Sequence, residues 1–199
     1  GSGSVNGMVY TRGDKADFDA WPKGWQWDDI VPAFEALEDK LKPKHRDATR
    51  FTQAAVGAWV NTGRKHKDGL NDGDLAGYIG HNAMNYQGDR RSSSYMAYLH
   101  DQPLGNLTVV SHCLTHKVIF ENRQAVAVEL EQKDKSNGQG KLQRVRANKE
   151  IILCAGALET PKLLMLSGVG PDSDLQRYEI PVVLEQAYIG ANLHDHPNV

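Results

Sequence analysis

Hydrophobic positions in the first half of the chain recur at helical spacing in two stretches. The first predicts a helix that has Asp28 as its N-cap, tolerates Pro32 in its first turn and ends near Lys42-Pro43. The second predicts a helix over 49–61. Its expected apolar face is formed by Phe51, Ala55, Val56, Trp59 and Val60. A Gly- and Asp-rich loop over 63–82 and a short helix over 92–99 follow.

From residue 106 the pattern changes to that of β-structure, with short runs of β-branched and aromatic residues. Asn137-Gly138 is typical of a hairpin turn between two of these runs. The predicted strands cover 107–110, 114–120, 125–132 and 142–147.

A continuous apolar run over 150–156 predicts a fully buried strand that ends at Gly156 and contains a buried Cys154. A helix follows, with Thr160-Pro161 at its start and Gly168 after its end. A buried strand, a glycine turn and a helix form one β–α step of an open α/β sheet, where ligands bind at the carboxyl ends of the strands.

Composition narrows the class of protein without changing this picture. The 199 residues are 40% hydrophobic and 24% charged, with a net charge of −2, which is ordinary for a globular domain. No basic stripe points to nucleic acid, and no apolar run approaches the roughly 20 residues of a membrane span. Two cysteines without metal-ligand spacing predict neither a disulfide framework nor a metal site.

Three segments are candidates for chemistry. Residues 1–13 form a Gly- and Ser-rich loop whose backbone N–H groups a polar or anionic ligand can approach, although any Gly/Ser turn has this property. Residues 156–170 form the turn and helix described above. Residues 190–197 bring Asp195 beside His194 and His196, but neighbouring loop residues point in different directions, so we favour a plain loop over a metal site or catalytic dyad.

Taken together and in this order, the three segments resemble the glucose–methanol–choline (GMC) oxidoreductase family. The first matches the family's N-terminal signature from Ser2 to Asp19, and the second matches its other signature from Gly156 to Gly170. The third is similar to the segment that follows in the family. Two shorter runs, 91–99 and 106–109, also look like the family, and the resemblance extends over nearly the whole chain apart from about 40–80.

The resemblance implies a mixed α/β fold, a partial Rossmann-like FAD-binding domain with part of a substrate domain. It implies three regions: an FAD-binding loop and following helix (1–45), a partial substrate region (46–104) and FAD-binding strands with a βα unit (105–199). FAD is expected to be bound non-covalently. The positions that correspond to the family's cofactor contacts are Ser2, Asn6, Gly7, Val9 and Thr115, with Ala155 and Gly156 near the ribose.

The resemblance also implies a fragment. The family's Gly-x-Gly-x-x-Gly fingerprint is expected before Gly1 and its catalytic histidine beyond Val199, so no catalytic residue is assigned in this chain. The isolated 199 residues are accordingly expected to be inactive, and to fold poorly, because apolar surfaces at 151–153 and 163–166 lack partners.

The function that follows from the resemblance is FAD-dependent oxidation of the CH–OH group of a small-molecule alcohol, with oxygen or a quinone-like carrier as electron acceptor. Two alternatives stay open: a lyase of the same fold, and a truncated remnant without enzymatic activity. Localisation is not fixed by the sequence, and a cytoplasmic or membrane-associated setting is a guess from the resemblance.

Overall fold

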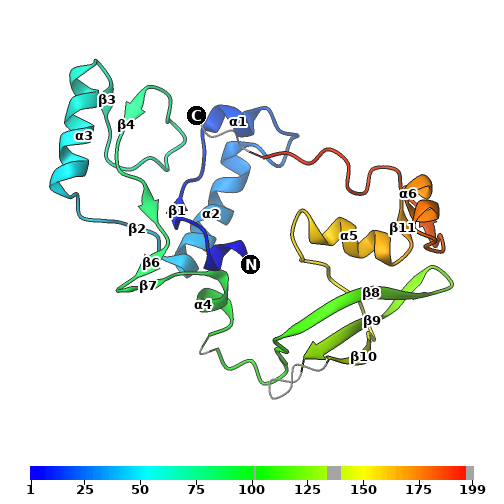
Figure 1. The fold of residues 1–199 in the computed structure, drawn as a ribbon. Helices are drawn as coiled ribbons and strands as arrows, with labels where there is room; N and C mark the ends of the chain where they lie inside the picture. Colours follow the sequence, from blue (N-terminus) through cyan, green and yellow to red (C-terminus); the bar gives the residue numbers. More distant parts are fainter. Residues whose placement is uncertain (101, 134–139, 196–199) are drawn as a thin grey trace. The chain divides into compact units, whose positions relative to one another are not determined.

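The computed structural model describes residues 1–100, 102–133 and 140–195. The chain divides into two compact units, residues 1–106 and residues 107–199, and each is described by itself (Figure 1). The predicted turn at Asn137-Gly138 and the end of the loop predicted over 190–197, including His196, lie outside the described residues.

The first unit combines short strands with four α-helices along its described part. The helices are α1 (Lys15–Asp19), α2 (Trp27–Leu41), α3 (Arg50–Asn61) and α4 (Ser94–Tyr98), preceded by a 3-10 turn, η1 (Ser2–Ser4). The strands are β1 (Val9–Tyr10), β2 (Lys44–His45), β3 (Lys65–His66), β4 (Tyr78–Ile79), β5 (Ala83–Met84), β6 (Tyr86–Gln87) and β7 (Arg90–Arg91).

Helix α2 starts two residues earlier than the sequence predicts. Gln26, not Asp28, is the N-cap, and the Asp29 carboxylate accepts hydrogen bonds from the N–H groups of Gln26 (3.2 Å) and Gly24 (3.0 Å). An acidic side chain in the first turn accepts hydrogen bonds from exposed N–H groups and interacts favourably with the positive end of the helix dipole. This favours a helix start at which Asp29 lies in the first turn. Pro32 consequently lies in the second turn rather than the first.

The core of the first unit forms where α2 meets a small sheet. Strand β5 lies between β1 and β2 and pairs antiparallel with both. Tyr10, Leu41 and Ala83 are buried together, and Leu37 and Ala97 pack against them. The strand that follows the N-terminal loop is thus fixed on the core of its unit.

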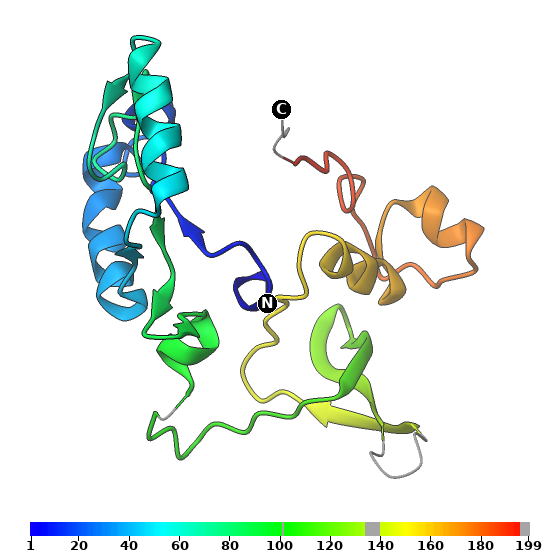
Figure 2. The same cartoon turned by 60° about the vertical axis from the view of Figure 1, so that its left-hand side comes forward.

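Helix α3 begins one residue after the predicted start, because Thr49 is its N-cap, and it ends at Asn61 as predicted. Its predicted apolar face is not buried. Phe51 is 80% exposed and Trp59 is 53% exposed, and no residue of α3 is buried. The helix lies beside β3 and β4 (Figure 2). Periodicity therefore located the helix correctly, but of its apolar face only Ala55 and Val56 are half-buried and the rest is exposed.

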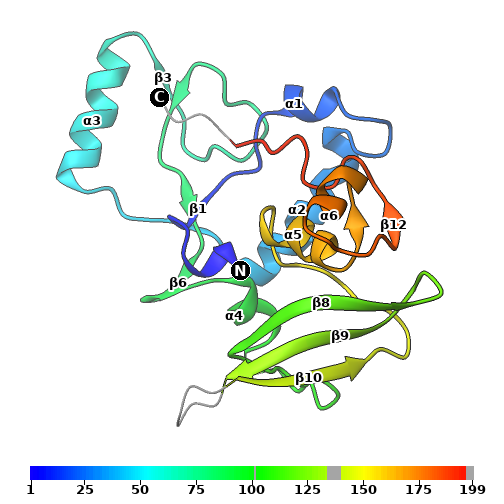
Figure 3. The ribbon, with the colours of Figure 1, turned by 45° about the vertical axis from the view of Figure 1, so that its right-hand side comes forward.

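The second unit contains an antiparallel sheet and two helices in its described part. Its elements are β8 (Cys113–Glu121), β9 (Gln124–Lys133), β10 (Gly140–Arg146), α5 (Glu159–Leu166), β11 (Val169–Gly170), α6 (Asp172–Arg177) and β12 (Leu184–Glu185). The sheet has the order β10-β9-β8, with one bulge in β8 and one in β9 (Figure 3). Three predicted strands are confirmed here. The strand predicted over 107–110 is wrong: no described strand pairs with it, and Val109 is 65% exposed.

The predicted buried strand over 150–156 is also wrong. The segment is unpaired, Ile152 is 73% exposed, and Cys154 is exposed rather than buried. A fully apolar strand needs neighbours along both edges and cover on both faces, and the described residues offer neither. The following turn and helix do form: the Thr160 Oγ1 accepts a hydrogen bond from the Ala155 N–H at 3.1 Å. Pro161 is the third residue of α5, not the first.

Ser167 joins α5 to the sheet. Its buried hydroxyl accepts a hydrogen bond from the Val118 N–H of β8 (2.8 Å) and donates one to the Leu163 carbonyl (2.6 Å). Gly168 follows with φ of +85°, which ends the helix as the sequence predicts. The chain then forms β11, which pairs in parallel with β12.

Replacing Ser167 by alanine is expected to lower the free energy of unfolding by about 1–3 kcal/mol. The Val118 N–H is left buried without an acceptor, which costs more than the hydrogen bond itself contributes. Chemical denaturation of the Ser167→Ala variant checks this. Ser173→Ala, at an exposed position of α6, is the matched control and is expected to change stability by less than about 0.5 kcal/mol.

None of the helices in the described ranges has both the length and the apolar character needed to cross a membrane.

Candidate functional site

The N-terminal loop, residues 1–8, presents hydrogen-bond donors to solvent. Three of its N–H groups form hydrogen bonds within the loop: the Ser4 N–H donates to the Gly1 carbonyl, and the N–H groups of Val5 and Asn6 donate to the Ser2 carbonyl. Within the described ranges, the Gly3 and Gly7 N–H groups have no protein acceptor. No described atom lies within 4 Å of where a side chain at either glycine would begin. The backbone is therefore open to close approach by a ligand.

Asn6 closes the end of this loop. Its Oδ1 accepts hydrogen bonds from the Met8 N–H (3.0 Å) and from Arg91 Nη1 (2.7 Å). Met8 has a left-handed backbone with φ of +66°, which costs a non-glycine residue free energy that the surrounding hydrogen bonds must offset. With Oδ1 occupied twice, the Asn6 side chain offers only its amide N–H groups outward, so it acts toward a ligand as a donor.

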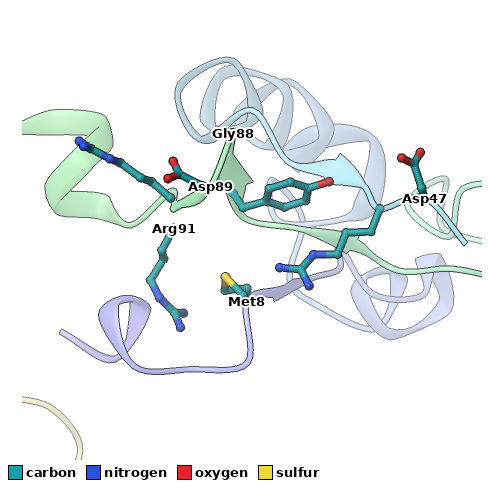
Figure 4. Close-up of a pocket in the computed structure, with 8 residues that line it drawn as sticks. Met8, Asp47, Gly88, Asp89 and Arg91 are labelled. Atoms are coloured by element: carbon teal, nitrogen blue, oxygen red, sulfur yellow. The ribbon is translucent and has the colours of Figure 1, made fainter. Parts of the chain in front are cut away.

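Arg91 reaches this loop from β7 (Figure 4). Its Nη1 also donates to the Asn6 carbonyl at 2.7 Å and lies 3.4 Å from the Gly3 carbonyl. All three acceptors are neutral oxygens, so the guanidinium charge is not neutralised by these bonds. The loop thus carries a fixed positive charge behind its free N–H groups.

A cavity of about 390 Å³ opens next to the loop. It is lined by Met8, Arg46, Asp47, Tyr86, Gly88, Asp89, Arg90 and Arg91. The Arg46 guanidinium lies 5.0 Å from the centre of the Tyr86 ring, a cation–π distance, while the Asp47 carboxylate points away from Met8 (Figure 4). The cavity lining thus combines three arginines and one tyrosine with two aspartates.

A charged network anchors the strand that leaves the loop. Glu38 on α2 accepts two hydrogen bonds from Arg12, both at 2.6 Å, and a third from the Tyr10 hydroxyl at 2.9 Å. Hydrogen bonding to Arg12 holds the pKa of Glu38 below its usual range. Burial, followed by the bond to Glu38, raises the pKa of Tyr10 to about 12. Tyr10 stays protonated and Glu38 ionised at neutral pH, so the network is complete there.

Thr115 belongs to the second unit. It lies half-buried on β8 and lines an open cavity of about 980 Å³, together with residues 150–155 and the start of α5. Ala155 also lines this cavity, and Gly156 begins the turn at its edge with φ of +95°. The apolar segment that the sequence assigned to a buried strand forms one wall of the cavity.

The predicted contact residues therefore fall into two groups. Ser2, Asn6 and Gly7 lie on the N-terminal loop and Val9 follows it on β1, whereas Thr115 and Ala155 share the cavity of the second unit. Their role as cofactor contacts stays a prediction. Arg91 carried no predicted role, although it lies in a run that looks like the family. Its contact with Asn6 joins residues 85 positions apart, which no local pattern in the sequence shows.

Comparison with known proteins assigns the chain to a family. The family model described as GMC oxidoreductase matches residues 1–198. The chain belongs to the GMC oxidoreductase family. The match includes both signatures on which the resemblance rested, so that prediction is confirmed.

Curated relatives of this family member include enzymes named oxygen-dependent choline dehydrogenase. The protein of Pectobacterium carotovorum subsp. carotovorum is 35% identical over 219 residues, and that of Yersinia pseudotuberculosis is 33% identical over 218 residues. Both alignments cover 98% of this chain and 38% of the relative. The chain therefore spans a little over a third of the length of these relatives.

Solved structures give the same result at the level of the fold. A formate oxidase has a TM-score of 0.78 and 27% identity, covering 92% of this chain and 35% of the oxidase. An FAD-dependent oxidoreductase from Chaetomium thermophilum has a TM-score of 0.71 and 25% identity, covering 93% of this chain and 37% of that protein. The predicted mixed α/β class, related to flavin oxidoreductases, is confirmed.

Proposed function

We propose that this family member binds FAD and that the protein which contains it oxidises the CH–OH group of a small-molecule donor. The observation that carries the proposal is the family match over residues 1–198, which includes the donor-lined N-terminal loop. Bound FAD supplies the acceptor for a hydride, while the protein contributes binding, orientation and electrostatics.

The residues of the loop fit this cofactor. The Gly3 and Gly7 N–H groups and the Asn6 amide are donors on an exposed and unobstructed backbone. The carbonyl edge of a flavin and the oxygens of a pyrophosphate are acceptors, and the pyrophosphate is anionic. A donor-rich loop with an arginine behind it favours such a ligand over a cation. In this proposal Ser2, Asn6, Gly7 and Val9 hold one part of FAD, and Thr115, with Ala155 and Gly156, lies toward its adenine and ribose.

Donor and acceptor are proposed from the relatives. Choline is an alcohol, and the relatives named oxygen-dependent choline dehydrogenase support an alcohol as donor and oxygen as acceptor. The formate oxidase supports a small substrate more generally. We assign no residue of this chain to proton abstraction from the donor, because no histidine in it corresponds to the family's catalytic position.

The test uses the natural protein purified from its source. Acid or heat denaturation is expected to release one FAD per chain, identified by its absorbance and mass, because the proposed binding is non-covalent. Anaerobic mixing with choline and a panel of other primary alcohols is then expected to bleach the flavin absorbance for at least one of them. Readmission of oxygen is expected to restore it. A protein that contains FAD but is bleached by no alcohol contradicts the proposed reaction, and one without flavin contradicts the proposed cofactor.

A further inference from the structure

One side chain outside the N-terminal loop donates hydrogen bonds to it. Within the described part of the chain, Arg91 is the residue beyond Met8 that hydrogen-bonds to residues 1–7. At the last residue of the loop, the Met8 carbonyl accepts a hydrogen bond from the Asn85 N–H at 2.8 Å. The loop is therefore tethered at two places, by a backbone bond at its base and by a guanidinium at its front.

The hydrogen bonds from Arg91 determine the direction of the free N–H groups of the loop. Arg91 Nη1 bonds to both the carbonyl and the side-chain oxygen of Asn6. These two bonds fix the peptide between Asn6 and Gly7 and direct its N–H away from the arginine. Without Arg91, residues 3–7 have no hydrogen bonds to described residues beyond Met8, and glycine-rich backbone samples many conformations.

We propose that Arg91 is a positioning residue for the cofactor: it holds the loop with the Gly7 N–H and the Asn6 amide presented to FAD, without itself touching the reacting atoms. This inference rests on the proposed function. Ligand affinity falls when a protein must order a loop on binding, because the ordering entropy is then taken from the binding free energy. A loop already ordered by Arg91 avoids that loss.

The chain offers a matched control at the next position. Arg90 lies on the same strand, has the same charge and lines the same cavity, and it forms no ion pair or side-chain hydrogen bond within the described residues. Any effect of net charge on an anionic cofactor is shared by Arg90→Ala and Arg91→Ala. Only the Arg91 change removes the bonds to the loop.

The experiment measures two properties of the natural protein and its Arg91→Ala, Arg91→Lys and Arg90→Ala variants. One is the Kd of the apoprotein for FAD, followed by flavin fluorescence. The other is hydrogen exchange of the amides of residues 1–8 in the apoprotein. Arg91→Ala is expected to raise the Kd about tenfold or more and to speed exchange in the loop, as the loss of hydrogen bonds from a charged donor predicts. Arg91→Lys is expected to restore part of both, and Arg90→Ala to leave exchange unchanged.

The outcomes separate the two proposals. If the natural protein binds FAD and Arg91→Ala matches Arg90→Ala in both Kd and exchange, the positioning role is overturned while the cofactor stands. If the natural protein binds no FAD but Arg91→Ala still speeds exchange in residues 1–8, the cofactor proposal fails and the loop-holding role survives. Weaker FAD binding in Arg91→Ala with a normal loop also counts against positioning, because the charge alone then explains it.

Discussion

Replacing Glu38 by alanine is expected to lower the free energy of unfolding by about 2 kcal/mol. The change leaves the Arg12 guanidinium, whose side chain is only 13% exposed, without its carboxylate and removes the acceptor of the Tyr10 hydroxyl. Breaking a buried pair by removing one partner costs about 3–5 kcal/mol, and the partial exposure of Glu38 reduces the figure here. Urea denaturation followed by tryptophan fluorescence measures it.

Glu35→Ala is the matched control for this change, since it removes the same charge from an exposed position of the same helix. It is expected to change stability by less than about 0.5 kcal/mol. Equal effects of the two substitutions would show that the Arg12–Glu38–Tyr10 network contributes nothing specific. The strand β1 and the loop before it would then need another anchor.

The difference between the natural protein and Glu38→Ala is also expected to depend on pH at both extremes. The pKa of Glu38 is lowered by Arg12 in the folded protein, so its contribution is complete above the ordinary 4.5 and is lost as pH falls through the folded-state pKa. The pKa of Tyr10 is raised to about 12, so its contribution is complete below 10.0 and is lost as pH rises toward 12. Denaturation midpoints of both proteins from pH 3 to 7 test the acid side, where a constant difference would contradict this assignment.

Replacing Gly168 by alanine is expected to lower the free energy of unfolding by about 3 kcal/mol. Gly168 has φ of +85°, and an added Cβ would meet the Pro181 carbonyl oxygen and lie 2.9 Å from Val183 Cγ2. Backbone atoms do not move away as a flexible side chain does, so strain in φ and overpacking add together. The turn that carries α5 into β11 would have to open. Thermal and urea denaturation of the variant measure the loss.

Gly156→Ala separates the two contributions. Gly156 has a similar φ of +95°, but no described atom lies within 4 Å of the position of an added Cβ. Only the backbone strain of about 1–2 kcal/mol is therefore expected there. If Gly156→Ala and Gly168→Ala destabilise equally, the contact with Pro181 is not the cause, and the backbone angle alone explains the requirement for glycine.

Local sequence signals located helices α2 to α5 and the three strands of the antiparallel sheet, but not α1, α6 or most of the two-residue strands. The periodicity of apolar residues placed α2 and α3 within a residue or two of their ends, and Thr49 and Gly168 marked a start and a stop. These signals work because helix formation, capping and left-handed turns depend on neighbours within about one turn. The two signatures also fixed the family, because they record residue types at fixed spacing along the chain.

The same signals failed where an outcome depended on distant partners. An apolar run over 150–156 is typical of a buried strand, yet a strand exists only if another strand pairs with it, and the described residues provide none. The exposed face of α3 is a second example: spacing creates an apolar face, but packing decides whether it is covered.

The sequence by itself determined the family, helices α2 to α5 and the loop whose glycines leave the backbone open, because each depends on residues close together along the chain. Only the tertiary structure decided how that loop is held. Arg91 meets Asn6 across 85 positions, and Arg12 meets Glu38 across 26. Contacts of this kind depend on the path of the chain between the partners, so they appear only once the strands and helices have been placed in space.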